Sequence, residues 1–243
     1  MPTRRRPPRQ LALAARGAGR GGYRHGAGRK PKPEEQRRGH RSRPALSPRF
    51  PVHVTLAVRP EVTSLRRGHA YHVLRQCFAL GKDRFGFRLT DFTVQGHHLH
   101  LVCEAEDKTA LGRGLQGLKI RIARRLNRKL GRTGALFAER YHERILRSPT
   151  EIRRVLVYVY GNSRKHVGGQ DRDWIDDRTS AAWFTGWRWP LRDMRLRPEG
   201  VPPVVAPRGW LLAAGWKRLG LIEPGEAPAP PRRGGHLPHR DEA

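Results

Sequence analysis

Four segments in the middle of the chain have the hydrophobic pattern of β-strands. Turn residues separate them, and the segments are Val52 to Val58, Arg88 to Val94, His97 to Ala105 and Leu136 to Leu146. Gly96 lies between the second and the third, which predicts a hairpin at that point. In the third segment Leu99, Leu101 and Cys103 alternate with other residues, so one face of this strand is expected to enter the core.

Three further segments predict helices. Thr63 to about Leu80 has apolar residues near one face, and Leu111 to Leu130 has leucine and isoleucine at spacings of three and four. A last helix is expected to open at residues 148–151, with Thr150 as the candidate N-cap. The predicted order is therefore β-α-β-β-α-β-α.

This order predicts an α+β fold. Its first six elements match the ferredoxin-like arrangement, a four-stranded antiparallel sheet with two helices on one face. The additional C-terminal helix, which carries Tyr158, must lie at the other face or at the sheet edge. Since strand side chains alternate, His98 and His100 are expected on that other face.

The chain has a formal net charge of +29 in 243 residues, which indicates a polyanionic partner, above all nucleic acid. Residues 1–50 contain thirteen Arg and two Lys against two Glu, without periodicity, and are expected to form a disordered basic arm that contacts phosphates. There is no run of 18 apolar residues, so no membrane span is expected. Two cysteines in apolar patterns favour a reducing compartment, and the expected location is cytoplasmic, associated with the nucleoid.

All six tryptophans follow residue 169, so residues 169–221 are interpreted as a Trp-rich extension that packs onto the folded domain of residues 51–168. Stacking of these tryptophans on unpaired bases is the alternative. Gly209 to Leu221 has the pattern of one short amphipathic helix, and the Pro-Ala repeats of residues 222–243 predict a disordered tail.

Two imidazoles on one strand face form a site for a divalent metal ion, because neutral imidazole is a common ligand of such ions. His98 and His100 are these candidates, with the amide of Asn162 as a third ligand and Gln95 or Glu104 as candidates for a further oxygen. Such a donor set leaves positions for phosphate and water, as Mg²⁺ or Mn²⁺ requires.

A tyrosine on the last helix is the candidate nucleophile. On a helical wheel Tyr158, Asn162 and Lys165 share one flank of the buried face, whereas Tyr160 lies on the opposite flank and remains the alternative nucleophile. A phenol is a weak nucleophile at its ordinary pKa, and a metal ion that polarises a phosphate offsets this weakness.

Phosphate contacts are expected from the basic faces of the long helix and from the lysine after the last one. These candidate DNA-binding residues are Lys119, Arg121, Arg124, Arg125, Arg128, Lys129 and Lys165.

Residues 51–168, about half of the chain, resemble the single-tyrosine HUH transposases, in particular the REP-associated tyrosine transposase branch. The resemblance is carried by His53-Val54-Thr55-Leu56, by residues 96–101 and 136–142, and by Tyr158-Val159-Tyr160-Gly161-Asn162 with Lys165-His166. It implies a ferredoxin-like catalytic domain that acts on single-stranded, hairpin-forming DNA, often as a homodimer. The branch commonly has Asn-Pro after the tyrosine, where this chain has Asn162-Ser163.

The resulting hypothesis is a transposase-like nuclease that cleaves and rejoins single-stranded DNA through a 5′-phosphotyrosine on Tyr158, with metal assistance at His98 and His100. One alternative is a catalytically silent, domesticated protein that binds single-stranded DNA or RNA. Another is an RNA-binding protein with a ferredoxin-like sheet, but such sheets display aromatic residues where this strand displays histidines.

Overall fold

The computed structural model describes residues 44–163, 174–191 and 200–228, so most of the basic arm, the last fifteen residues and Lys165 lie outside it. In these ranges a single antiparallel sheet has the strand order β2-β3-β4-β1-β5. The strands are β1 (Val52–Ala57), β2 (Asp83–Arg84), β3 (Phe87–Val94), β4 (His98–Ala105) and β5 (His142–Ile145). The predicted four-stranded ferredoxin-like sheet is confirmed, and the two-residue β2 adds a fifth strand at one edge.

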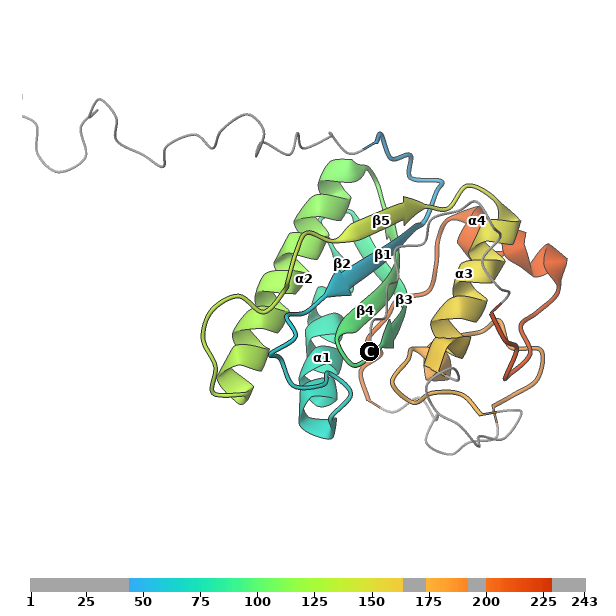
Figure 1. Cartoon of the computed structure of the whole chain (residues 1–243). Coiled ribbons are helices and arrows are strands. Elements are labelled where there is room, and N and C mark those ends of the chain that lie inside the picture. Colours follow the sequence, from blue (N-terminus) through green and yellow to red (C-terminus); the bar gives the residue numbers. More distant parts are fainter. Residues whose placement is uncertain (1–43, 164–173, 192–199, 229–243) are drawn as a thin grey trace, which may run out of the picture. The chain divides into compact units, whose positions relative to one another are not determined.

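Two helices cover one face of this sheet, and the third covers the other (Figure 1). The helices are α1 (Gly68–Gly81), α2 (Lys108–Lys129), α3 (Pro149–Gly161) and the short α4 (Trp210–Ala213). Leu99, Leu101 and Cys103 of β4 pack into the core beneath α1 and α2, whereas Val102 belongs to the core beneath α3. The predicted alternation along β4 is therefore confirmed.

The predicted strand from Leu136 to Leu146 is divided in two. Thr55 pairs with His142. Val58 lies three residues after Thr55, but it pairs with Phe137, which lies five residues before His142. The segment between the two pairings therefore bulges from the ladder, and only its second half forms β5.

Two helix starts differ from the sequence prediction. The segment before α1 is not helical, because the backbone N–H of Leu65 donates to the carbonyl of Gly96 at the β3–β4 hairpin. The N-cap of α3 is Ser148, whose hydroxyl accepts from the N–H of Glu151 at 3.3 Å, and not Thr150. Pro149 fits the first helical position, because an N–H group there would have no acceptor within the helix and proline therefore loses no hydrogen bond.

The C-terminal segment packs on the α3 face and is more ordered than its sequence predicts. Trp216 is fully buried, whereas Trp210 and Trp189 are exposed. The predicted packing of the tryptophans onto the domain therefore holds for Trp216 but not for Trp210 and Trp189. The predicted helix of residues 209–221 is divided into α4 and a 3₁₀ helix, η5 (Gly215–Leu219). At the start of η5 the Trp210 ring packs so closely on Gly215 that a Cβ there would lie 2.7 Å from it.

Ile222 is also buried, and it forms a β-bridge with Trp187. The guanidinium of Arg153 on α3 binds the Glu226 carboxylate at 2.5 Å. The prediction of a tail disordered from residue 222 is therefore wrong for residues 222–228.

We expect two glycines of α2 to respond oppositely to alanine. A Cβ on Gly114 would lie 2.2 Å from the buried Phe87 ring, so Gly114→Ala should lower the free energy of unfolding by about 1–3 kcal/mol through overpacking. Gly117 is exposed with no atom within 4 Å of such a Cβ, so Gly117→Ala should raise it by up to about 1 kcal/mol. Urea unfolding measures both variants, and equal effects would contradict this packing of α2 on β3.

Candidate active site

The pairing of β1 with β4 builds the floor of the site. Thr55 lies directly opposite His100, and His53 lies opposite Val102, so both β1 side chains share a sheet face with His100. Thr93 of β3 flanks His100 from the other side. His98 begins β4 on the same face, two residues before His100. The sequence did not single out His53 or Thr55 as site residues, although their alternation in the first strand matched this face.

The ring of His100 is held between strand β1 and helix α3. Its Nδ1 lies 3.2 Å from the hydroxyl oxygen of Thr55, and its Nε2 lies 3.4 Å from the hydroxyl oxygen of Tyr158. The ring stacks on His53 with centroids 5.4 Å apart, and Tyr158 meets both imidazoles edge-on. His100 is only 2% exposed, so these contacts fix its orientation.

Burial determines the charge of His53 in this stack. Desolvation, with a smaller contribution from the Arg144 charge, lowers the pKa of His53 to about 4, so His53 is neutral at physiological pH. Its Nε2 is buried and has no hydrogen-bond partner among the described residues. His53 therefore adds no positive charge to the stack.

Helix α3 presents Tyr158 to the histidines. Ile152, Val155 and Val159 are buried, which anchors the helix on the sheet and leaves Tyr158 half-buried at the border of the core. Asn162 caps the helix one turn further on, with its backbone N–H bonded to the carbonyl of Tyr158. The structure thus brings Tyr158 to His100 and places Asn162 on the same flank.

The donor set fits a divalent cation that keeps open positions. No cluster of three His, Cys, Asp or Glu side chains occurs in the described ranges. His98 and His100 lie on one strand face and are two candidate nitrogen donors, and the Nε2 of His100 is directed at the phenol of Tyr158. Ligation by His98, His100 and Asn162 remains a prediction.

Tyr160 points away from the histidines. It is 2% exposed, and its hydroxyl donates to Asp91 at 2.5 Å and lies 3.2 Å from the hydroxyl of Ser180. Burial, followed by the neighbouring Asp91, raises the pKa of Tyr160 well above its usual value. Of the two tyrosines, Tyr158 is therefore the one that contacts the histidines.

A buried ion pair secures the C-terminal end of α3. Both oxygens of Asp176 accept from the guanidinium of Arg66, at 2.6 and 2.9 Å, and the hydroxyl of Ser163 also donates to this carboxylate. Although burial opposes ionisation, the hydrogen bonds from Arg66 and Ser163 hold the pKa of Asp176 below its usual value. Gln95 donates to Ser163 and Thr93 at 3.0 Å each, so this amide supports the helix end.

Glu104 is not a metal ligand at this site. Its carboxylate accepts from the backbone N–H groups of Arg208 and Gly209 and from Arg88. It lies four residues from His100 along β4, a distance of about 13 Å at the rise of a strand. Glu104 instead attaches the C-terminal segment to the sheet.

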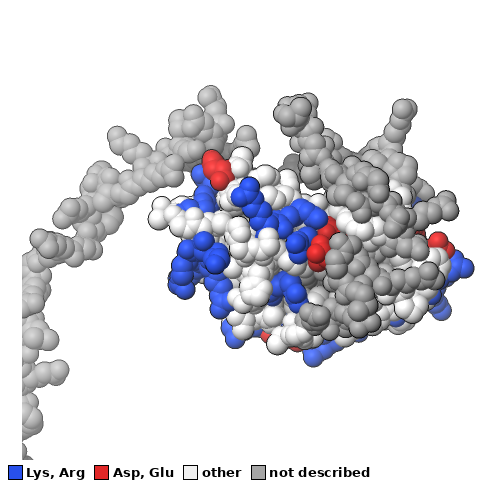
Figure 2. Space-filling view, turned by 90° about the horizontal axis from the view of Figure 1, so that it is seen from below, with Lys and Arg blue, Asp and Glu red and all other residues white. Residues whose placement is uncertain are grey.

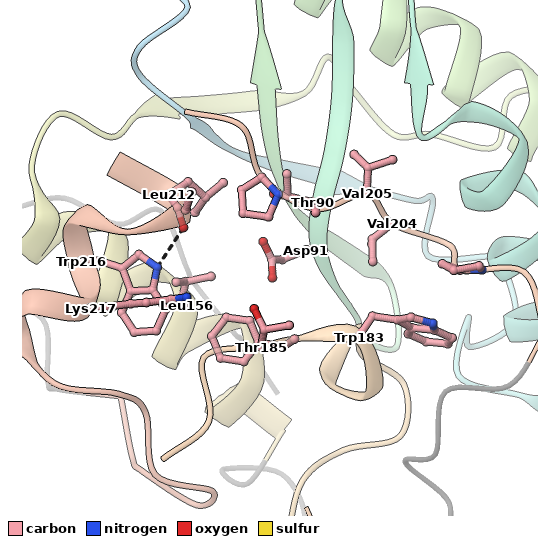
Figure 3. Close-up of a pocket in the computed structure, with 15 residues that line it drawn as sticks. Thr90, Asp91, Leu156, Trp183, Thr185, Val204, Val205, Leu212, Trp216 and Lys217 are labelled. Carbon is pink, nitrogen blue, oxygen red and sulfur yellow. Dashed lines mark hydrogen bonds between the residues drawn. The ribbon is translucent and has the colours of Figure 1, made fainter. Parts of the chain in front are cut away.

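A cavity of about 250 Å³ is bordered by Leu156 of α3 and by the C-terminal segment (Figure 3). Leu156, Trp183 and Trp216 contribute apolar surface, and Asp91 lies in the middle of the lining residues. Burial raises the pKa of Asp91 to about 6, against the hydrogen bonds from Tyr160 and Thr90.

The basic residues of α2 lie across the sheet from Tyr158, since α2 covers the face that Leu99 and Leu101 enter. Three of the candidate DNA-binding residues contact neighbouring elements: Lys119 donates to the carbonyl of Glu139, Arg125 to Gln76, and Arg121 lies against Gly81. The exposed candidates on this helix are Arg124, Arg128 and Lys129.

The helix α2 has eight Lys or Arg and no Asp or Glu. In the view from below, Lys and Arg cover more of the described surface than Asp and Glu do (Figure 2). Because α2 lies across the sheet from Tyr158, its cations do not surround the hydroxyl of Tyr158.

Two solved structures are similar to part of this chain. One is a REP-associated tyrosine transposase bound to a REP hairpin, with 19% identity and a TM-score of 0.45 over 55% of this chain and 78% of that one. The other is a putative transposase from Deinococcus radiodurans R1, with 17% identity and a TM-score of 0.35 over 50% of this chain and 93% of that one. No known family and no curated protein matches the sequence.

None of the described helices combines the length and the hydrophobicity that crossing a membrane requires.

We expect opposite pH dependences from Asp91 and His53. Asp91 binds its proton more tightly when folded, with a pKa of about 6 against 3.8, so its contribution to stability is lost as the pH rises through this range. His53 has a folded pKa of about 4 against 6.5, so its contribution is lost as the pH falls from 6.5 to 4.

As the pH rises from 4 to 6, the free energy of unfolding of Asp91→Asn should therefore rise relative to wild type by roughly 2–3 kcal/mol. Over the same range that of His53→Phe should fall relative to wild type by roughly 2–3 kcal/mol. Urea unfolding at pH 4, 5, 6 and 7 measures both. Profiles parallel to wild type would contradict the buried environments of these two groups.

Proposed function

We propose that this protein is a transposase-like nuclease that cleaves and rejoins single-stranded DNA with Tyr158 as its nucleophile. The observation that carries this proposal is the contact of the Tyr158 hydroxyl with Nε2 of His100, on the strand face that also holds His98. A net charge of +29 supports a nucleic-acid substrate.

In the cleavage step the phenol oxygen of Tyr158 attacks the phosphorus of a phosphodiester. The phenol gives up its proton to water, the bond from phosphorus to the 3′ oxygen breaks, the DNA 5′ end becomes joined to Tyr158, and the released 3′ oxygen takes up a proton from water. A 3′-hydroxyl that attacks this phosphotyrosine reverses the bond changes and releases Tyr158. Because the tyrosyl ester conserves the phosphodiester linkage, this chemistry suits strand transfer better than hydrolysis.

A Mg²⁺ or Mn²⁺ ion bound at His98, His100 and Asn162 would stabilise the negative charge that develops on the phosphoryl oxygens. The protein's own residues orient the reactants: α3 anchors Tyr158, and the ion pair of Arg66 with Asp176 secures the end of this helix beside Asn162. The exposed cations of α2 bind a stretch of the DNA that is distant from the reacting phosphate. Lys165 and the basic arm add further phosphate contacts.

The nucleophile is tested with labelled, hairpin-bearing single-stranded DNA and Mn²⁺ or Mg²⁺, with covalent adducts resolved on denaturing gels. We expect an adduct with wild type, none with Tyr158→Phe, and a reduction of roughly 10²-fold with His98→Ala. Tyr160→Phe is the matched control: it removes a phenol two residues away and should retain the adduct, at a cost in stability. Loss of the adduct with Tyr160→Phe alone would contradict the proposed nucleophile. DNA binding without an adduct under either metal would favour the catalytically silent binding protein.

The role of α2 is tested by neutralising three of its exposed cations. The combined Arg124→Gln, Arg128→Gln and Lys129→Gln variant should bind single-stranded DNA more weakly, and its slope of log K against log salt should become shallower by about 2. Its adduct rate at saturating DNA should be unchanged, because these residues lie across the sheet from Tyr158. The charge-matched control is Arg154→Gln with Lys217→Gln and Arg218→Gln, three exposed cations of α3 and η5. An equal change of slope in both variants would show an effect of net charge alone.

A further inference from the structure

Both ring nitrogens of His100 face a hydroxyl group. On the β1 side Nδ1 lies 3.2 Å from Oγ1 of Thr55, and on the α3 side Nε2 lies 3.4 Å from the hydroxyl of Tyr158. The stack with His53 covers the ring, which limits its rotation. The imidazole thus connects a strand hydroxyl to the candidate nucleophile.

A neutral imidazole carries its proton on only one nitrogen, and the partner of the other nitrogen decides which one. If Nδ1–H donates to Thr55, Nε2 keeps its lone pair toward Tyr158, where it accepts from the phenol or binds a metal ion. If the proton is on Nε2, the lone pair faces Thr55, and neither a metal ion nor the phenol proton can use it. The catalytic value of His100 therefore depends on its tautomer.

We propose that Thr55 is a positioning residue that holds His100 in the Nδ1–H tautomer and so directs the Nε2 lone pair at Tyr158. In metal sites the non-ligating nitrogen of a histidine is commonly hydrogen-bonded in this way, which fixes both the tautomer and the ring orientation. The inference deepens the proposed function, on which its metal-binding consequence rests.

The chain contains a matched control for Thr55. Thr93 lies opposite His100 from β3, as Thr55 does from β1, but the hydroxyl of Thr93 accepts from the amide of Gln95. Both threonines neighbour the same histidine in the same sheet. If the hydroxyl of Thr55 acts on His100, the two valine variants should differ. If the substitutions only disturb strand packing, the two variants should behave alike.

The experiment compares wild type, Thr55→Val, Thr55→Ser and Thr93→Val as full-length proteins. The first measurement is the tautomer of His100 in the metal-free protein at pH 8, from ¹⁵N chemical shifts of labelled histidine assigned with His100→Gln. We expect the proton on Nδ1 in wild type, Thr55→Ser and Thr93→Val, and a mixture of tautomers in Thr55→Val.

The second measurement is Mn²⁺ affinity by titration calorimetry, which requires no DNA cleavage. Thr55→Val should weaken binding by about 10–100-fold, Thr55→Ser should restore it, and Thr93→Val should leave it within a few-fold of wild type.

A proton on Nε2 in wild type, or an unchanged tautomer in Thr55→Val, would overturn the proposal. Equal losses in Thr55→Val and Thr93→Val, or failure of Thr55→Ser to restore binding, would also overturn it and indicate strand packing. If the tautomers are as expected but wild type binds no Mn²⁺, the role of Thr55 stands and the metal-assisted function fails.

Discussion

The antiparallel pairing of β1 with β4 is the constraint on which the site depends. It places Thr55 opposite His100 and His53 opposite Val102. The hydroxyl of Thr55 and the stacked ring of His53 then hold the imidazole of His100. A slip of one residue would turn Thr55 and His53 toward α1 and α2 and would bury their polar atoms in an apolar core. The residues of β1 that enter this core, Val54 and Leu56, are therefore what fixes the register for the polar face.

The sheet separates two kinds of surface. One face holds the histidines and Tyr158, in a setting where burial keeps His53 neutral. The other face is covered by α1 and by α2, whose Lys and Arg have no acidic residue on the same helix. The basic surface of α2 is thus kept apart from Tyr158. Under the proposed function, substitutions on α2 would change the affinity for nucleic acid without moving the reacting atoms.

Two buried carboxylates, Glu104 and Asp176, tie the C-terminal segment to the domain, and a third, Asp91, ties α3 to β3. Glu104 accepts from the backbone of Arg208 and Gly209, Asp91 accepts from Tyr160, and Asp176 binds Arg66. Removing one partner of such a group leaves an uncompensated polar or charged atom in the interior, which costs several kcal/mol. The segment after α3 is for this reason part of the domain that orients Tyr158.

The sequence by itself determined the element order, the two-faced pattern of β4 and the separation of Tyr158 from Tyr160 around the last helix. These features follow from the periods of strand and helix, which are properties of neighbouring residues along the chain. Only the tertiary structure decided which side chains meet. Thr55 and His100 are 45 residues apart, and Glu104 and Arg208 are 104 apart, so no local pattern reveals their contacts. The same reason explains why Glu104 fails as a metal ligand: it carries the right atoms, but packing gives its hydrogen bonds to the C-terminal segment.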